Sequence, residues 1–312
     1  MYKFSLGNFI SESNQLLENV EIAYHIFGEL APEKKVIWVC HALTANSDAQ
    51  DWWPNFIGEN LTLDTEKYTI VCANILGSCY GTSFQKQEKL PLITIRDMVK
   101  LHQELAKFLQ ISEIELLLGG SLGGMQCLEW AIAEPDFIKK LFVIATNAKH
   151  SAWGIAFNEA QRMALELGEN GIDAARAIAM LSYRNYATFE ETQTDEEEKL
   201  EQYRAASYQR HQGEKLRKRF SKESYFMLSK AMDSHHLGRG RNSVENALNQ
   251  ITAETLVIGI DSDILFPVSE QKFIAEHIKN AKLEVISSLY GHDGFLIETE
   301  KISTLLKKHF KL

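Results

Sequence analysis

A serine framed by glycines stands near the middle of the chain. Residues 119–123 read Gly-Gly-Ser-Leu-Gly, which places Ser121 in a Gly-x-Ser-x-Gly pattern. A mostly apolar stretch, residues 114–118, precedes the pattern, and helix-forming residues follow it. A serine on so sharp a strand-to-helix turn takes a strained backbone conformation, and only glycine neighbours avoid the adjoining strand and helix. The pattern therefore predicts a nucleophilic serine with its hydroxyl exposed at the apex of the turn.

The same turn indicates where negative charge could be stabilised. The backbone N–H of Leu122 and the positive end of the following helix would point at the space above Ser121, where an oxyanion would form. A second N–H donor should come from the loop after residues 36–40, which makes Leu43 the candidate. Gly-rich turns also bind phosphate, but this one lacks the Gly-Lys-Ser/Thr ending and the Gly-x-Gly-x-x-Gly spacing of phosphate loops.

Candidates for the acid and the base that a serine nucleophile needs come later in the chain. Asp261 and Asp263 follow one predicted strand, and His292 follows the last predicted strand. The order serine, aspartate, histidine is the chain order of an α/β-hydrolase triad. An imidazole with a reference pKa of about 6.5 can accept the serine proton and return it, while the acid fixes the imidazole tautomer. Spacing alone does not separate Asp261 from Asp263.

Other histidines compete with His292 for the role of base. His41 lies at the end of a predicted strand, and His235 and His236 lie in a helical region. None of the three follows the candidate acid in chain order, so the pattern favours His292.

Strands and helices alternate on both sides of the serine. Apolar runs predict buried strands at residues 36–40, 68–74, 114–118, 140–145, 255–260 and 283–286. Thr94 and Asp97 have the spacing of a capping box, which predicts a helix to about residue 109. The period-2 pattern of residues 20–27 is typical of an antiparallel edge strand. This alternation predicts an α/β-hydrolase fold with a mostly parallel central sheet.

A long helical block interrupts the alternation. Helices without strands are predicted within residues 151–249, among them 153–167, 171–186 and 224–232. We expect a core of residues 1–150 and 250–312 that carries the serine, acid and histidine, and a helical lid insertion of residues 151–249. The acidic run 190–201 and the basic run 215–219 fit solvated faces.

The composition and charge of the chain indicate which classes of molecule it can bind. The chain has 312 residues and a formal net charge of −9, which argues against nucleic acid or an anionic membrane as the main partner. We expect no export signal, no membrane span and a small-molecule substrate. The cysteines lack the spacing of a metal site, so we expect no metal, buried reduced thiols and a cytoplasmic location. They are Cys40, Cys72, Cys79 and Cys127.

Six motifs in order resemble the homoserine O-acetyltransferases of the α/β-hydrolase superfamily, and the resemblance runs nearly end to end. They are His-Ala-Leu-Thr at 41–44, Asn-Ile-Leu-Gly-Ser at 74–78, Gly-Gly-Ser-Leu-Gly-Gly-Met-Gln at 119–126, Ala-Phe-Asn-Glu at 156–159, Ser-Asp-Ile-Leu-Phe-Pro at 262–267 and Gly-His-Asp at 291–293. The resemblance implies transfer of acetyl from acetyl-CoA to the hydroxyl of L-homoserine, a step of methionine biosynthesis, by a ping-pong mechanism. It implies acetyl-CoA as a co-substrate, no permanently bound cofactor, and a homodimer formed through the helical lid.

The resemblance also implies particular residues. It selects Asp263 as the triad acid, and it suggests Arg176, Tyr183 and Asp293 as substrate contacts. Arg176 and Tyr183 are seven residues apart on one predicted helix and so face the same way. A guanidinium can clamp the amino-acid carboxylate, and Asp293 can pair with the ammonium group.

Related activities use the same triad and remain open at this point. They are succinyl transfer to homoserine, acetyl transfer to serine, and ester hydrolysis with water as acceptor. One methylene group changes the binding free energy in a pocket by only about 1–3 kcal/mol, so closely related enzymes can differ in substrate. A noncatalytic binding relative would be expected to lack a triad member. The chain departs from the family in a short loop at 168–170, which trims the insertion near the channel, and at 81–84.

Overall fold

The central sheet of the computed structural model, which describes residues 1–168 and 170–311, has eight strands in the order β1-β2-β6-β3-β7-β8-β9-β10. The strands are β1 (Tyr2–Ile10), β2 (Leu16–Phe27), β3 (Lys35–Cys40), β6 (Tyr68–Ala73), β7 (Ile114–Gly120), β8 (Ile138–Ile144), β9 (Glu254–Ile260) and β10 (Ala281–Ile286). β1 and β2 are antiparallel, and all pairings from β6 to β10 are parallel. The predicted mostly parallel α/β sheet is therefore confirmed. A separate pair, β4 (Ile57–Gly58) and β5 (Leu63–Asp64), lies outside it.

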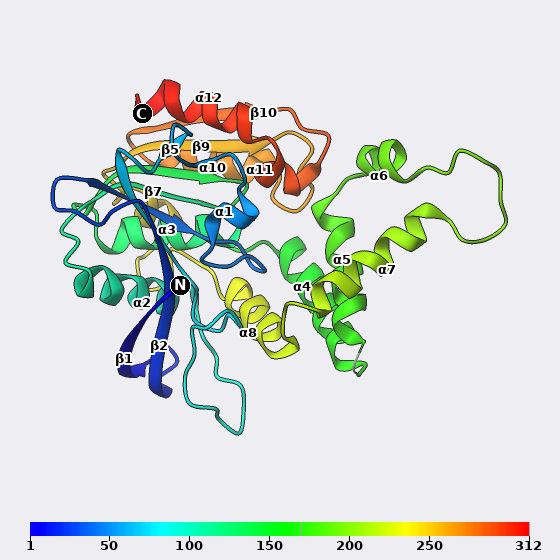
Figure 1. The fold of residues 1–312 in the computed structure, drawn as a ribbon, viewed down its shortest axis with the longest axis horizontal. Coiled ribbons are helices and arrows are strands. Elements are labelled where there is room, and N and C mark those ends of the chain that lie inside the picture. Colours follow the sequence, from blue (N-terminus) through cyan, green and yellow to red (C-terminus); the bar gives the residue numbers. More distant parts are fainter. Residues whose placement is uncertain (169, 312) are drawn as a thin grey trace.

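Helices cover both faces of this sheet (Figure 1). They are α1 (Ala49–Trp52), α2 (Ile95–Phe108), α3 (Leu122–Ala133), α10 (Val268–His277), α11 (Gly294–Ile297) and α12 (Thr299–Phe310), with a 3-10 turn η1 (Gly291–Asp293). Apolar side chains of α2, α3 and α10 belong to one buried cluster, and those of α1 and α12 belong to a second. The two clusters take opposite strand faces, because successive residues of β3 alternate between them: Ile37 is in one and Trp38 in the other.

The capping box predicted for α2 is present. The Thr94 side chain accepts from the Asp97 N–H, and the Asp97 side chain accepts from the Thr94 N–H. The Asp97 carboxylate also accepts from the N–H of Glu12 at 2.7 Å, so the cap ties the start of α2 to the β1–β2 hairpin.

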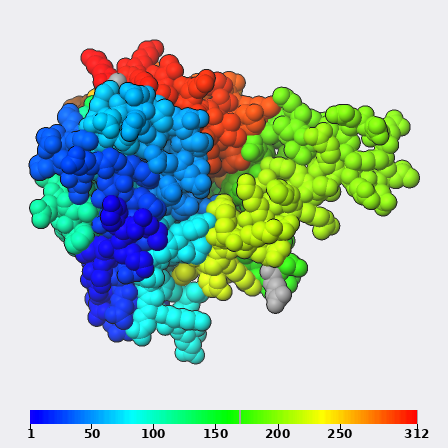
Figure 2. All heavy atoms as spheres, viewed as in Figure 1, coloured from blue at the N-terminus to red at the C-terminus, as the bar shows by residue number. Residues whose placement is uncertain are grey.

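The helical insert lies between β8 and β9. Its helices are α4 (Ala152–Glu166), α5 (Gly171–Tyr183), α6 (Tyr186–Gln193), α7 (Arg204–Arg217), α8 (Lys222–Asp233) and α9 (Val244–Leu248). The predicted helix 171–186 ends earlier, at Tyr183, because Asn185 caps a new helix by accepting from the Thr188 N–H. Helices α5, α6 and α7 stand to one side of the sheet, and the space-filling view shows this part projecting from the core (Figure 2). Glu169, in the short loop 168–170, lies outside the described residues.

Two further expectations concern the thiols and the membrane. The cysteines are free, but Cys79 is exposed, so the prediction of buried thiols is wrong for Cys79 and holds for Cys40, Cys72 and Cys127. Cys79 lies in the loop after β6 rather than in a strand, which explains its exposure. Within residues 1–168 and 170–311, every helix is too short or too polar to cross a bilayer.

Candidate active site

Ser121 forms the apex of the turn between β7 and α3. Its φ of 56° and ψ of −127° are strained for a non-glycine residue. A Cβ on Gly123 would lie 2.1 Å from the carbonyl oxygen of Cys40, and one on Gly119 would lie 2.5 Å from the backbone of Gly123. Both positions are therefore closed to any side chain, and this is the steric reason for the glycines in the pattern.

The three residues predicted as a triad come together at the carboxyl ends of the strands. His292 Nε2 lies 2.9 Å from Ser121 Oγ, and His292 Nδ1 lies 2.7 Å from Asp263 Oδ2. The other carboxylate oxygen, Asp263 Oδ1, accepts from the N–H groups of Leu265 and Phe266 at 2.8 and 2.9 Å. Because the carboxylate only accepts, Nδ1 of His292 carries the proton, and the lone pair of Nε2 faces the serine hydroxyl.

The rival acid has a different role. Asp261 accepts from the N–H of Ser288 and makes no contact with His292, so it stabilises the turn after β10.

Two of the three rival bases, His41 and His235, are held in the core, whereas His236 is half-buried. His41 Nδ1 donates to the Ala42 carbonyl at 2.9 Å, and Nε2 accepts from the N–H of Ile75. Burial lowers the pKa of His41 to about 4 and that of His235 to about 3. His235 Nε2 donates to the carbonyl of Asn147. These imidazoles are neutral structural groups, whereas the ring of His292 reaches the serine.

Ser121 and His292 open into a cavity of 580 Å³ between the core and the insert. Its lining includes the predicted substrate contacts Arg176, Tyr183 and Asp293. The Arg176 guanidinium carbon lies 5.2 Å from the centre of the Tyr183 ring, so the two side chains are neighbours on α5 as their spacing predicted. Burial raises the pKa of Tyr183 above its ordinary value, which keeps the phenol protonated at neutral pH.

Asp293 is not a free carboxylate. Its Oδ2 lies 2.9 Å from Nε of Arg184, which follows α5 directly and also stacks over the ring of Tyr290. The C-terminus of α5 packs closely on this turn, since a Cβ on Gly291 would lie 2.9 Å from the carbonyl oxygen of Tyr183. One helix of the insert thus contacts the turn that carries the histidine.

Of the two predicted N–H donors, Leu122 directly follows Ser121, and Leu43 lines the same cavity as Ser121. Leu122 is the first residue of α3, and Leu43 lines the cavity within a turn closed by the Ala45 N–H bonding to the Ala42 carbonyl at 3.1 Å.

Several cavity residues were not predicted from the sequence, and two of them are cations. Lys215 and Arg219 are exposed, as the interpretation of the basic run as a solvated face requires, and they also line the cavity. Arg219 Nη1 donates to the carbonyl of Thr44 at 2.6 Å and bonds the hydroxyl of Tyr80 at 2.7 Å. Their spacing of four residues is a signal, but it does not separate a cavity lining from an exposed face, and Arg219 lies beyond the end of α7.

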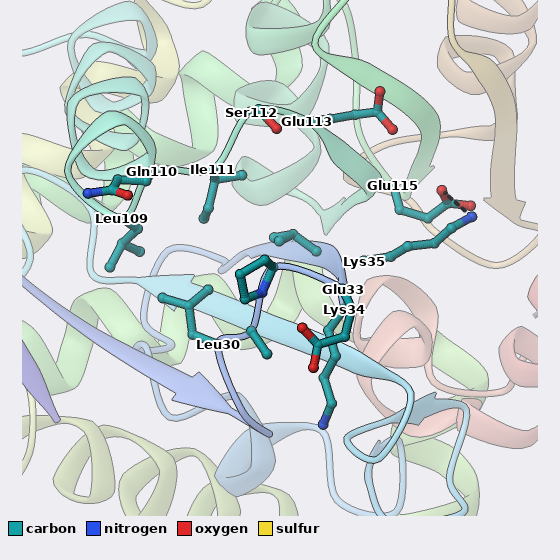
Figure 3. Close-up of a pocket in the computed structure, with 13 residues that line it drawn as sticks. Leu30, Glu33, Lys34, Lys35, Leu109, Gln110, Ile111, Ser112, Glu113 and Glu115 are labelled. Atoms are coloured by element: carbon teal, nitrogen blue, oxygen red, sulfur yellow. Dashed lines mark ion pairs between the residues drawn. The ribbon is translucent and has the colours of Figure 1, made fainter.

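A second hollow, of 640 Å³, lies at the other end of the sheet, where β3 and β7 begin (Figure 3). Its polar lining includes Lys35 and Glu115, which form an ion pair at 2.9 Å. Lys140 also pairs with Glu115, so this carboxylate is already neutralised. The groove is far from the chemistry, since Ser121 follows the opposite end of β7.

Comparison with known proteins agrees with this geometry. The family model described as alpha/beta hydrolase fold matches residues 35–299. A homoserine O-acetyltransferase of Cyclobacterium marinum is 41% identical, over 96% of this chain and 92% of the relative. The crystal structure of homoserine O-acetyltransferase from Staphylococcus aureus aligns with a TM-score of 0.88 at 29% identity, covering 100% of this chain and 95% of that one. Esterase E22, at 18% identity and a TM-score of 0.88 over 99% of this chain and 99% of its own, shares the fold. The chain belongs to the homoserine O-acetyltransferase family within the alpha/beta hydrolase fold.

Proposed function

We propose that the protein transfers the acetyl group of acetyl-CoA to the side-chain hydroxyl of L-homoserine, a step of methionine biosynthesis. Family membership supports this, and one feature of the cavity carries it: Ser121 shares the lining with Arg176 and Asp293. These opposite charges match the carboxylate and the ammonium group of a free amino acid. An esterase that uses water as acceptor needs neither group.

In the first half-reaction the Ser121 hydroxyl gives its proton to His292 Nε2 while Oγ attacks the thioester carbonyl carbon. The N–H groups of Leu43 and Leu122 stabilise the resulting oxyanion. Asp263 keeps the Nδ1 proton in place and stabilises the imidazolium. The C–S bond then breaks, the CoA thiolate takes the proton from His292, and acetyl-Ser121 remains.

In the second half-reaction homoserine replaces CoA in the same cavity. Arg176, with the half-buried Tyr183 beside it, binds the carboxylate, and Asp293, whose Oδ2 pairs with Arg184, offers Oδ1 to the ammonium group. His292 takes the proton of the homoserine hydroxyl, whose oxygen attacks the acetyl carbon. Ser121 Oγ leaves and recovers the proton, so the enzyme returns to its starting state. Acetyl-CoA is therefore a co-substrate that leaves as CoA in each turnover.

We also propose that helices α4–α9 act as a lid, residues 151–249, over a core of residues 1–150 and 250–312, and that two copies pair through this lid. Exposed apolar side chains support the pairing: Trp153 is 53% exposed, Met163 62% and Leu181 53%. Light scattering should give the mass of a dimer, and the M163E/L181E variant should give a monomer. A monomeric parent protein would refute the pairing.

A cytoplasmic location fits this function. The buried free thiols of Cys40, Cys72 and Cys127 support a reducing compartment.

The test of the function varies donor and acceptor separately. Thiol release is followed with acetyl-CoA or succinyl-CoA, and with homoserine, serine or no acceptor. We expect steady turnover only with acetyl-CoA and homoserine together. Thiol release at the same rate with and without an acceptor would indicate a hydrolase. A preference for succinyl-CoA or serine would overturn the substrate assignment.

A further inference from the structure

The turn that carries Leu43 is held from both the core and the insert. On the core side, the Ala45 N–H closes the turn onto the Ala42 carbonyl, and His41 Nδ1 donates to the same carbonyl. On the other side, Arg219 donates to the carbonyl of Thr44, 175 residues away in the chain. The Thr44 carbonyl and the Ala45 N–H belong to one peptide, and the Ala42 carbonyl and the Leu43 N–H belong to another. The hydrogen bond that closes the turn therefore joins the peptide held by Arg219 to the peptide that presents the Leu43 N–H.

Arg219 is itself held firmly, although it is exposed as a residue. It lies between α7 and α8, where its N–H donates to the Leu216 carbonyl and its own carbonyl accepts from the thiol of Cys79 at 3.8 Å. The next residue, Phe220, is buried and packs on the ring of Tyr80, with ring centres 5.7 Å apart. The hydroxyl of that same tyrosine bonds the guanidinium at 2.7 Å.

The positive charge of Arg219 is directed at the carbonyl of Thr44. Among the described residues, no carboxylate lies within 4.0 Å of its guanidinium. A charged donor makes a stronger hydrogen bond to a carbonyl than a neutral donor does. Arg219 hydrogen-bonds the Thr44 carbonyl and the Tyr80 hydroxyl at the edge of the cavity, so it stabilises the turn of residues 42–45 in one conformation.

We infer that Arg219 is a positioning residue for the oxyanion site: the insert uses it to fix the turn that presents the Leu43 N–H. The inference rests on the proposed acyl transfer through Ser121. Oxyanion donors are effective because they are oriented before reaction, and removing one such donor costs about 100- to 1,000-fold in rate. A donor that is present but misoriented should lower the rate less than a missing donor does, by about 10- to 100-fold. Both half-reactions form an oxyanion at this position, so both should slow together.

A different role for the same charge makes a different prediction. If Arg219 only attracted the phosphorylated donor to the cavity, its loss would raise KM for acetyl-CoA and leave the rate at saturation unchanged. Lys215 lines the same cavity with the same charge but has no bond to the turn, so it provides the matched comparison.

The experiment compares R219M, K215M and K218M by rapid mixing with acetyl-CoA and then with homoserine. Lys218 is exposed and, within the described part of the chain, pairs with Glu214 alone, which makes K218M the control for a lost charge in this region. For R219M we expect the rate constants of acetylation and deacetylation at saturation to fall about 10- to 100-fold. Both KM values should stay within about threefold, and K218M should keep the parent rate constants within about threefold. K215M removes a cavity charge that does not bond the turn, so it should lose less rate than R219M.

Two more measurements separate positioning from general damage to the fold. Affinity for a trifluoromethyl ketone, which forms a hemiketal oxyanion on the serine, should fall in R219M in parallel with kcat/KM. R219K keeps the charge with a single donor group and should recover part of the rate, and it replaces R219M if that variant does not fold. A parent-like rate in R219M, an effect on KM alone, or an equal loss of rate in K215M would overturn the inference. Failure of the parent protein to form acetyl-Ser121 would instead refute the proposed function.

Discussion

Asp263→Asn is the substitution for which the structure predicts the largest effect from the smallest change. Asp263 accepts three hydrogen bonds: Oδ1 takes the N–H groups of Leu265 and Phe266, and Oδ2 takes Nδ1–H of His292. Asparagine has only one side-chain oxygen. That oxygen should stay on the two backbone donors, because leaving two buried N–H groups unpaired costs about 1–3 kcal/mol each.

The asparagine NH2 group must then face His292. Nδ1 can no longer donate and has to accept, so the imidazole proton moves to Nε2, which faces Ser121. A base with a proton on its reacting nitrogen cannot deprotonate the serine. In a serine protease the corresponding change lowers kcat by about 10,000-fold with the geometry intact, and we expect a loss of similar size here. That factor corresponds to about 5.5 kcal/mol of activation free energy.

The assay is the rate constant of CoA release in the first half-reaction at saturating acetyl-CoA, with thermal unfolding as a check of the fold. Asp261→Asn is the matched control, because in the described structure the Asp261 side chain accepts one hydrogen bond, from the Ser288 N–H, and an asparagine oxygen can replace it. We expect D261N to stay within about threefold of the parent rate. A folded D263N that retains a tenth of the parent rate would refute the argument about the tautomer.

Three further outcomes follow from the structure. Asp293→Asn should raise KM for homoserine about 10- to 100-fold, because the ammonium group loses its charged partner, and change acetylation by less than threefold; equal losses in both half-reactions would contradict this role. Gly123→Ala should abolish acetylation and lower Tm, because its Cβ would overlap the Cys40 carbonyl; a variant with parent Tm and rate would show that the turn can relax. Burial lowers the pKa of four histidines well below 6.5, so the unfolded chain binds their protons first and the free energy of unfolding should fall as pH drops from about 6.5 to 4. The four are His41, His102, His150 and His235. Urea unfolding at several pH values measures this slope, and a flat profile would contradict it.

The features that could be predicted from the sequence are those with local physical causes. The glycines around Ser121 mark a turn where a Cβ would overlap backbone, and the Thr94–Asp97 spacing marks a helix start because both side chains reach backbone N–H groups nearby. Burial of successive apolar residues marks the parallel strands. Each of these features is decided within a few residues of the chain.

The features that could not be predicted depend on contacts between distant segments. Arg219 meets Thr44 only because the insert folds back over the cavity, and Arg184 meets Asp293 only because α5 ends against η1. In the sequence, both arginines look like ordinary charges on a helical surface.

Transfer through Ser121 is tested most directly by following labelled acetyl groups. The protein is mixed with acetyl-CoA labelled in the acetyl group, free of acceptor, then separated from CoA and treated with homoserine. We expect the label to appear first on the peptide containing Ser121, to be absent from that peptide in S121A, and then to move to O-acetylhomoserine. Direct appearance of labelled product without labelled protein, or label ending only in acetate when homoserine is present, would contradict it.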